Sequence, residues 1–323
     1  MNDLRKTFQQ KSTIAPEVSV RLHTITDDEA GQRIDNFLLR VCKGVPKTWV
    51  YRVIRKGEVR VNKGRIDADY KLQTGDIIRI PPVRVAEKQA SNVPNSRAVP
   101  LPIVYEDDHL LIINKPAGLA VHGGSGVSFG VIEQLRAAYP QQKFLELVHR
   151  LDRETSGLLI LAKKRSALTN LHEQIRDGQM DKRYYAILIG ELNDKETHVK
   201  APLYKYLTAS GERRVQVDEN GQPAHSRFNV DQNLDGYTAV RVKIYTGRTH
   251  QIRVHSAFLG HPIVGDEKYG DFELNKQLAK VKHGRMFLHA QELKIKHPAT
   301  GETLTVRSEL PAEFSGFLKA YRK

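Results

Sequence analysis

The stretch between Pro82 and Pro102 most constrains the fold, because it divides the sequence into two parts. It is rich in proline, serine, asparagine, glutamine and alanine and has no aromatic residue, so it cannot supply a hydrophobic core. A chain of 323 residues is long enough for about two domains. We therefore predict a polar leader (residues 1–17), a first domain (residues 18–82), a linker (residues 83–98) and a second domain (residues 99–323).

The first domain is predicted to contain two helices and a few short strands. Apolar residues recur at helical spacing in Ile34–Val41 and again in Val50–Ile54. Strands are predicted at Glu58–Val61 and Asp76–Ile80, and Asn62–Gly64 has the composition of a turn. This is a small α/β unit of about 65 residues.

The second predicted helix and the segment after it are strongly basic. Between residues 43 and 66 the sole acidic residue is Glu58. A solvated helix surface is the alternative explanation, but this scarcity of acid favours contact with nucleic-acid phosphates. The candidate RNA-binding residues are Lys47, Arg52, Arg55, Lys56 and Arg60.

The charge of the whole chain agrees with a polyanionic partner. It has 51 basic and 37 acidic side chains and a formal net charge of +14. No run of about 18 apolar residues is present, which argues against a membrane protein. The single cysteine, Cys42, allows no internal disulfide or cysteine metal cage, so we expect a reducing compartment, the cytoplasm.

Strand patterns outnumber helix patterns in the second domain, which predicts an α+β fold with a mixed, mainly antiparallel sheet flanked by helices. It opens with a hairpin that turns at Asp107-Asp108. The remaining predicted strands are Leu145–His149, Gly157–Ala162, Tyr184–Gly190, Arg213–Val217, Arg227–Val230, Tyr237–Ile244 and Met286–His289. The predicted helices are Val131–Ala138, Ala167–Arg176 and Thr249–Leu259.

Common cofactor and metal motifs are missing. The glycine-rich segment after His122 matches neither a nucleotide P-loop nor a G-x-S-x-G nucleophile turn. His250 and His255 are five residues apart and lack the helical spacing and third ligand of a zinc site. We expect no metal and no cofactor.

Three polar segments remain as candidates for chemistry. Asp152 lies in HRLDRETSG (residues 149–157) between two apolar runs, where it is either a catalytic loop carboxylate or a turn former. In GRTHQIRVH (residues 247–255), Thr249 is a plausible N-cap and Arg253 would face a cleft, where it could pair with a loop carboxylate or bind phosphate. In KRYYA (residues 182–186), Tyr184 and Tyr185 face opposite sides of a strand, so one can pack in the core while the other stacks on a base.

These three segments resemble, in order and spacing, three motifs of the RluA-type pseudouridine synthases. NKPAG (residues 114–118) with Val121-His122 is similar to the opening motif of that family, and FLHA (residues 287–290) to its closing one. The first domain resembles an S4 RNA-binding domain. Within the family, Val18–Pro82 and GGSGVSFGVIE (residues 123–133) most resemble a member that acts on large-subunit ribosomal RNA.

The resemblance implies an RNA isomerase that works without a cofactor and flips its target uridine out of the RNA. It makes Asp152 the catalytic carboxylate, Tyr184 the aromatic that stacks on uracil and Arg253 the partner of Asp152. Leu288 would be an apolar neighbour in the pocket, and Arg150 would contact the RNA around the vacated base. Asp152 could attack C1′, attack uracil C6 or remove the C2′ proton, and the sequence does not choose between these.

The expected partner is large-subunit ribosomal RNA, with no obligatory protein partner and a monomeric chain. Two alternatives stay open at this point. One is the same chemistry on transfer RNA, and the other is a non-catalytic RNA-binding factor for ribosome assembly.

Overall fold

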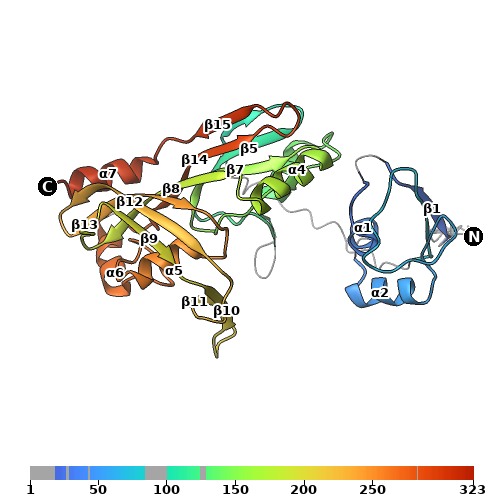
Figure 1. Cartoon of the computed structure of the whole chain (residues 1–323), viewed down its shortest axis with the longest axis horizontal. Coiled ribbons are helices and arrows are strands. Elements are labelled where there is room, and N and C mark those ends of the chain that lie inside the picture. The colour runs from blue at the N-terminus through green and yellow to red at the C-terminus, as the bar shows by residue number, and fades with distance from the viewer. Residues whose placement is uncertain (1–18, 27–28, 43, 84–99, 124–128, 282) are drawn as a thin grey trace, which may run out of the picture. The chain divides into compact units, whose positions relative to one another are not determined.

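The computed structural model describes residues 19–26, 29–42, 44–83, 100–123, 129–281 and 283–323. The chain divides into two compact units, Met1–Asn95 and Ser96–Lys323, and Figure 1 labels many of their elements. The predicted leader lies outside the described residues, as does the predicted linker apart from Val83. Five positions of the glycine-rich segment, residues 124–128, also lie outside them.

The first unit is a small antiparallel sheet, in the order β1-β3-β2, with two helices. Its elements are β1 (Arg21–Thr24), α1 (Ile34–Val41), α2 (Lys47–Arg55), β2 (Arg60–Val61) and β3 (Ile77–Ile80). Both helices bury their predicted apolar stripes in one core, to which Phe37 and Val53 belong. The turn predicted at Asn62–Gly64 is confirmed, because Asn62 and Lys63 have φ values of 49° and 69°.

The second unit is built on one large sheet with the strand order β4-β5-β7-β14-β8-β13-β12-β9, to which β15 and β6 are added at β14 and β7. Its pairs are antiparallel except β14 with β7, which is parallel, so the predicted mixed, mainly antiparallel sheet is confirmed. The strands are β4 (Ile103–Glu106), β5 (Leu110–Lys115), β6 (Glu146–Leu147), β7 (Ser156–Ala162), β8 (Asp181–Ile189), β9 (Glu196–Lys200), β12 (His225–Leu234), β13 (Tyr237–Ile244), β14 (Leu288–Lys296) and β15 (Thr303–Arg307). Two further strands, β10 (Leu203–Leu207) and β11 (Arg213–Val217), form a separate hairpin.

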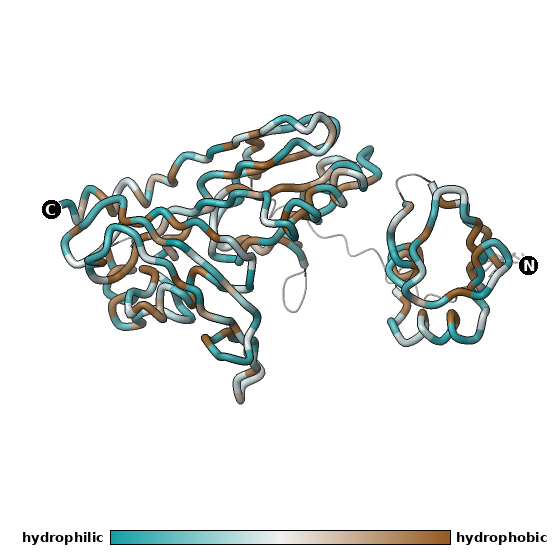
Figure 2. The backbone as a smooth tube through the Cα atoms, viewed as in Figure 1, coloured by the Kyte–Doolittle hydropathy of each residue, from teal (hydrophilic) through white to brown (hydrophobic). Residues whose placement is uncertain are grey.

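Helices cover both faces of this sheet. The helices are α3 (Val131–Ala138), α4 (Arg165–Arg176), α5 (Gln251–Phe258), α6 (Phe272–Lys280) and α7 (Ala312–Ala320). Alternating side chains of β8 show the two faces: Tyr184 packs in a core with α3 and α5, whereas Tyr185 packs in another core with α7. A third core lies between β5, β7 and α4. Figure 2 shows hydrophobic stretches along the inner strands, as expected for a sheet covered on both faces.

Several predicted boundaries are wrong. The strand predicted at Leu145–His149 is only Glu146–Leu147, and the one predicted at Met286–His289 begins at Leu288 and continues to Lys296. In β14 charged residues alternate with buried ones over residues 293–296, a regular strand pattern that extends beyond the predicted end at His289. Among the elements without a clear sequence signal are β1 and α7: most of β1 is exposed, and α7 buries only two side chains, Phe314 and Phe317.

The predicted turn at Asp107-Asp108 joins β4 to β5 and is organised by one carboxylate. Asp107 Oδ1 accepts hydrogen bonds from the backbone N–H groups of His109 and Leu110, both at 2.7 Å. Asp107 Oδ2 accepts from the Tyr105 hydroxyl at 2.9 Å and lies 2.7 Å from His297 Nε2. Burial alone would raise the pKa of Asp107, but these hydrogen bonds outweigh it and lower the pKa to about 2.

Asp107→Asn should therefore destabilise the protein in a pH-dependent way. A pKa of about 2 in the folded state, against 3.8 ordinarily, corresponds to about 2 kcal/mol at neutral pH. Because the folded pKa is the lower one, this contribution is complete well above pH 3.8 and is lost as the pH falls towards 2. Urea unfolding of both proteins at pH 7 and pH 3 should show the difference shrink by about half. A difference that does not change with pH would contradict this account.

Candidate active site

A cavity of about 810 Å³ in the second unit brings the three polar segments together. Its wall includes residues 147–153 ahead of β7, the first half of β8, and residues 247–253 at the start of α5. Its volume lies within the usual range for small-ligand sites. The residues predicted for the site that line it are Arg150, Asp152, Tyr184, Arg253 and Leu288.

The loop that carries Asp152 is fixed to the end of β5 by a buried lysine. Lys115 is fully buried, and burial lowers its pKa to about 7. Its ammonium donates to the carbonyl oxygens of Pro116, Leu119 and Arg153 at 2.8, 2.9 and 3.0 Å. The Arg153 carbonyl therefore cannot move without breaking this network, and the neighbouring Asp152 is held in place.

Arg253 on α5 is shared between two carboxylates. Its Nε and Nη2 donate to Asp266 at 2.7 Å each, and its Nη1 donates to Asp152 Oδ2 at 3.2 Å. Burial alone would lower the pKa of Arg253, but the hydrogen bonds and charge of Asp266, and then of Asp152, raise it. The side chain lines the cavity but is only 6% exposed, so it is more enclosed than a residue facing an open cleft.

Asp266 is absent from the residues predicted from the sequence. It is fully buried, and its Oδ1 also accepts the backbone N–H groups of Lys268 and Tyr269 at 2.8 and 3.1 Å. The only nearby residue that marks this position in the sequence is the preceding Gly265. It has φ +77°, and a Cβ added to it would lie 1.8 Å from a backbone oxygen. A glycine required at that point indicates a tight turn, but it does not reveal the partner of the next side chain.

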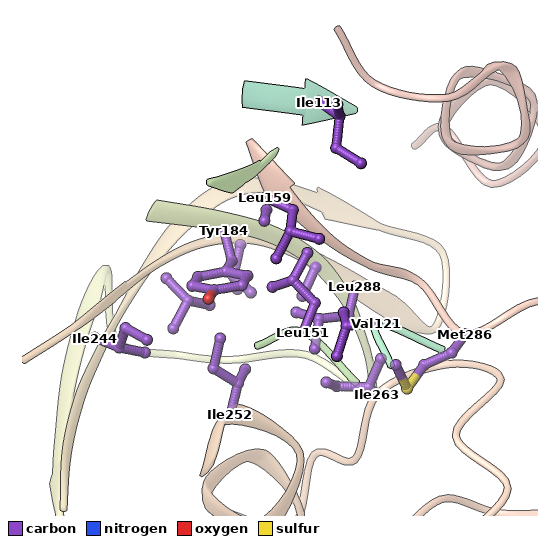
Figure 3. Close-up of a cluster of buried hydrophobic side chains, with 14 of the residues drawn as sticks. Ile113, Val121, Leu151, Leu159, Tyr184, Ile244, Ile252, Ile263, Met286 and Leu288 are labelled. Atoms are coloured by element: carbon purple, nitrogen blue, oxygen red, sulfur yellow. The ribbon is translucent and has the colours of Figure 1, made fainter. Parts of the chain in front are cut away.

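Tyr184 projects from β8 into the core next to the cavity (Figure 3). The ring is surrounded by apolar side chains, of which Leu151, Ile244, Ile252 and Leu288 also line the cavity. Tyr184 is 8% exposed, and burial followed by the charge of Asp152 raises the pKa of its phenol. Tyr185 lies on the opposite face and donates to Asp231 at 2.8 Å. Both tyrosines are thus buried, but only Tyr184 lines the cavity.

The predicted N-cap of α5 is wrong. His250, with φ 54°, is the capping residue rather than Thr249. The adjoining backbone N–H of Arg248 instead donates to Gln251 Oε1 at 3.0 Å. His250 Nδ1 lies 2.7 Å from the Tyr269 hydroxyl, and its Nε2 lies 3.9 Å from Asp152 Oδ1. Burial lowers the pKa of His250, against the opposing charge of Asp152.

The basic residues predicted in the first unit lie on its surface. Lys47, Arg52 and Arg55 are exposed on α2, opposite the buried Val50 and Val53. Lys56 and Arg60, which follow α2, are also exposed. Arg60 donates to the backbone carbonyls of Gly57 and Lys63 at 3.2 Å each, so part of its hydrogen-bonding capacity is used inside the protein.

Comparison with known proteins identifies two families and close relatives. Residues 109–258 match the RNA pseudouridylate synthase family and residues 32–78 match the S4 domain. The chain is 52% identical over 309 residues to the ribosomal large subunit pseudouridine synthase C of Haemophilus influenzae, covering 94% of this chain and 96% of that protein. It is 54% identical over 298 residues to the Escherichia coli K12 protein of the same name, covering 90% and 93%.

Solved structures show the same likeness. Human RNA pseudouridylate synthase domain containing 1 is similar with a TM-score of 0.56 and 28% identity, over 66% of this chain and 84% of that one. The corresponding human domain containing 4 gives the same TM-score and identity, over 68% and 92%. Among the described residues, no helix is both long and apolar enough to cross a membrane.

Asp266→Asn should destabilise the folded protein strongly. The substitution removes the charge that receives two of the three hydrogen bonds made by buried Arg253 to carboxylates. We expect the free energy of unfolding, measured with urea at neutral pH, to fall by about 3 kcal/mol. The exposed neighbour Glu267 provides the control, and Glu267→Gln should change it by less than about 0.5 kcal/mol. Equal stability of Asp266→Asn and wild type would show that Asp152 alone compensates Arg253.

Proposed function

The chain belongs to the RNA pseudouridylate synthase family, and from this membership we propose that it converts uridines of large-subunit ribosomal RNA to pseudouridine, with Asp152 as the catalytic carboxylate. One observation carries the assignment of Asp152. It is the carboxylate that lines the cavity, where its Oδ2 accepts a hydrogen bond from Arg253 at 3.2 Å. The relatives named for large-subunit ribosomal RNA, which match nearly the whole chain, support the choice of substrate.

The reaction requires a carboxylate with one oxygen that is not bound by the protein. It breaks the bond between uracil N1 and ribose C1′, turns the base and joins C5 to C1′. C5 loses its proton and N1 gains one, so the oxidation state does not change. Arg253 holds one Asp152 oxygen, whereas the other lies 3.9 Å from the nearest histidine nitrogen, that of His250. The first contact orients the carboxylate, and the second oxygen is available to the nucleotide.

The apolar part of the cavity is suited to a base taken out of the RNA stack. A uridine inside a helix cannot reach Asp152, so its base must be turned out at a cost of a few kcal/mol. The Tyr184 ring and the side chains of Ile244, Ile252 and Leu288 offer a wall for the uracil. Stacking of a base on an aromatic ring returns about 1–3 kcal/mol. Tyr184 is therefore the proposed stacking residue and Leu288 its apolar neighbour.

The charge around the cavity matches an RNA strand. Its only lining carboxylate, among the described residues, is Asp152. The lining cations are Arg150, Arg153, Arg176, Lys182, Arg248 and Arg253. Such an excess of positive charge attracts phosphates and releases their counterions. Arg150 is exposed, lines the cavity and is proposed to contact the RNA around the vacated base.

The substrate and the role of Asp152 can be tested in one experiment. Pseudouridines are mapped across total RNA from cells that lack the protein and from the same cells supplied with wild type, Asp152→Asn or Asp194→Asn. Wild type and Asp194→Asn, an exposed position outside the cavity lining, should restore the missing sites in large-subunit ribosomal RNA. Asp152→Asn should reduce the rate of modification by more than about 1000-fold while still binding RNA.

Each alternative predicts a different map. Loss of pseudouridine from transfer RNA alone would contradict the ribosomal substrate. Normal modification by Asp152→Asn would contradict the assignment of that residue. An unchanged map without the protein would favour a binding role in ribosome assembly. With ribosomal RNA as substrate and a single cysteine in the chain, the proposed compartment is the cytoplasm.

The first unit, which contains the residues that match the S4 domain, is proposed to add RNA affinity and to take no part in the chemical step. Arg52→Glu combined with Arg55→Glu reverses two exposed charges on α2. We expect the KM for an unmodified transcript of large-subunit ribosomal RNA to rise about tenfold, with kcat within about twofold. The control, Lys280→Glu with Lys319→Glu, makes the same change in net charge at exposed positions outside the cavity lining and should leave KM near the wild-type value. An equal loss of kcat would contradict this division of roles.

A further inference from the structure

Lys182 is a nearly buried cation at the edge of the cavity. It lies near the start of β8, two residues before Tyr184, and therefore on the same face of the sheet. Its residue exposure is 8%, and it lines the cavity together with Tyr184 and Gly247. A Cβ placed on Gly247 would be 3.4 Å from Lys182 Nζ, so the missing side chain keeps the approach to the ammonium open.

Within the described residues, no carboxylate pairs with Lys182. The adjacent Asp181 points to the other face of the sheet, where Arg183 and Lys243 bind it at 3.0 and 2.9 Å. Burial lowers the pKa of Lys182 with no acidic group to oppose it. The positive charge of Lys182 also adds to the burial that lowers the pKa of His149 to about 3. A cation removed from water without a counter-charge is costly unless something else supplies one.

The other enclosed cations of this region have partners inside the protein. Arg253 is bound by Asp266 and Asp152, and Lys115 donates to three backbone carbonyls. The remaining lining cations, Arg150, Arg153, Arg176 and Arg248, are exposed, so water can solvate them. Lys182 differs from both groups because it is enclosed and has no such partner in the described part of the chain.

We propose that Lys182 binds a phosphodiester of the RNA strand that carries the reacting uridine. The inference rests on the proposed function, because phosphate is the anionic group of RNA and the cavity is where that strand must enter. An ammonium acts on phosphate as a compact point charge with three donors. Lys182 is thus a substrate-binding residue that anchors the backbone beside the base wall formed by Tyr184.

The test compares three variants by the kinetics of pseudouridine formation on an unmodified transcript of large-subunit ribosomal RNA. Lys182→Met removes the charge and keeps the aliphatic stem, and Lys182→Arg keeps the charge. Lys243→Met is the matched control, since Lys243 lies on the neighbouring strand β13 but on the opposite face, paired with Asp181. For each protein kcat and KM are measured over a series of KCl concentrations.

We expect Lys182→Met to raise KM about tenfold with kcat within about twofold, because the phosphate contact is made in both the bound state and the transition state. The slope of log(kcat/KM) against log[KCl] should become shallower by about 0.7, the value for one phosphate contact in single-stranded RNA. Lys182→Arg and Lys243→Met should keep the wild-type slope.

A wild-type KM and slope in Lys182→Met would overturn the proposal. A raised KM with an unchanged slope would also overturn it, because Lys182 would then contact an uncharged group of the uridine. If Lys182→Met does not fold, Lys182→Gln, which also removes the charge, is measured in its place, and a wild-type KM and slope for that variant would overturn the proposal. If wild type forms no pseudouridine, the proposed function fails, whereas the salt dependence of transcript binding by wild type and Lys182→Met still tests Lys182.

Discussion

The guanidinium of Arg253 is the interaction on which the arrangement of the site depends. It gives two hydrogen bonds of 2.7 Å to Asp266 and one of 3.2 Å to Asp152. The unequal lengths separate two roles: Asp266 is fully buried and fixes the arginine, whereas Asp152 is 26% exposed and is held by one oxygen. A guanidinium has a fixed plane, so binding one edge to Asp266 sets the direction in which Nη1 meets the second carboxylate.

The sheet supplies the rigidity that this contact requires. Arg253 and Asp152 are 101 residues apart in the chain, so only the tertiary fold can hold them together. Just after the Asp152 loop, β7 pairs in parallel with β14 through Gly157, where a Cβ would lie 2.3 Å from the Ala290 backbone oxygen. On the other side, Lys115 binds the Arg153 carbonyl from the end of β5. The Asp152 loop is thereby tied to β7 and to the end of β5, two strands that cannot shift independently.

The residues that could be found from sequence are those whose local pattern is itself unusual. Asp152 lies in a polar segment between two apolar runs, and Arg253 lies on a helix that follows a strand. These patterns made both residues candidates, and the resemblance to the RluA-type synthases then singled them out. Asp266 was not, because its segment has no period and its importance comes from a partner 13 residues away. The N-cap of α5 was misplaced for a different, local reason: the helix begins at Gln251, after His250 in the left-handed region, and Gln251 Oε1 accepts the N–H of Arg248 three residues earlier. The mixed sheet followed from strand density, whereas α7 becomes recognisable only against the core that contains Tyr185.

Two enclosed cations on the cavity wall show how the protein distributes its internal charge. Arg253 has carboxylate partners within the chain and so remains paired before any substrate arrives. Lys182, two residues from Tyr184 on the same face of β8, has none among the described residues. A paired cation can hold the proposed catalytic carboxylate in position before substrate binds, but a further anion adds little stabilisation to it. An unpaired one gains most when a phosphate enters, because the incoming charge offsets a desolvation cost already present in the folded protein. Rigid placement of the carboxylate and attraction of the RNA backbone are therefore assigned to different side chains, so each can be optimised without weakening the other.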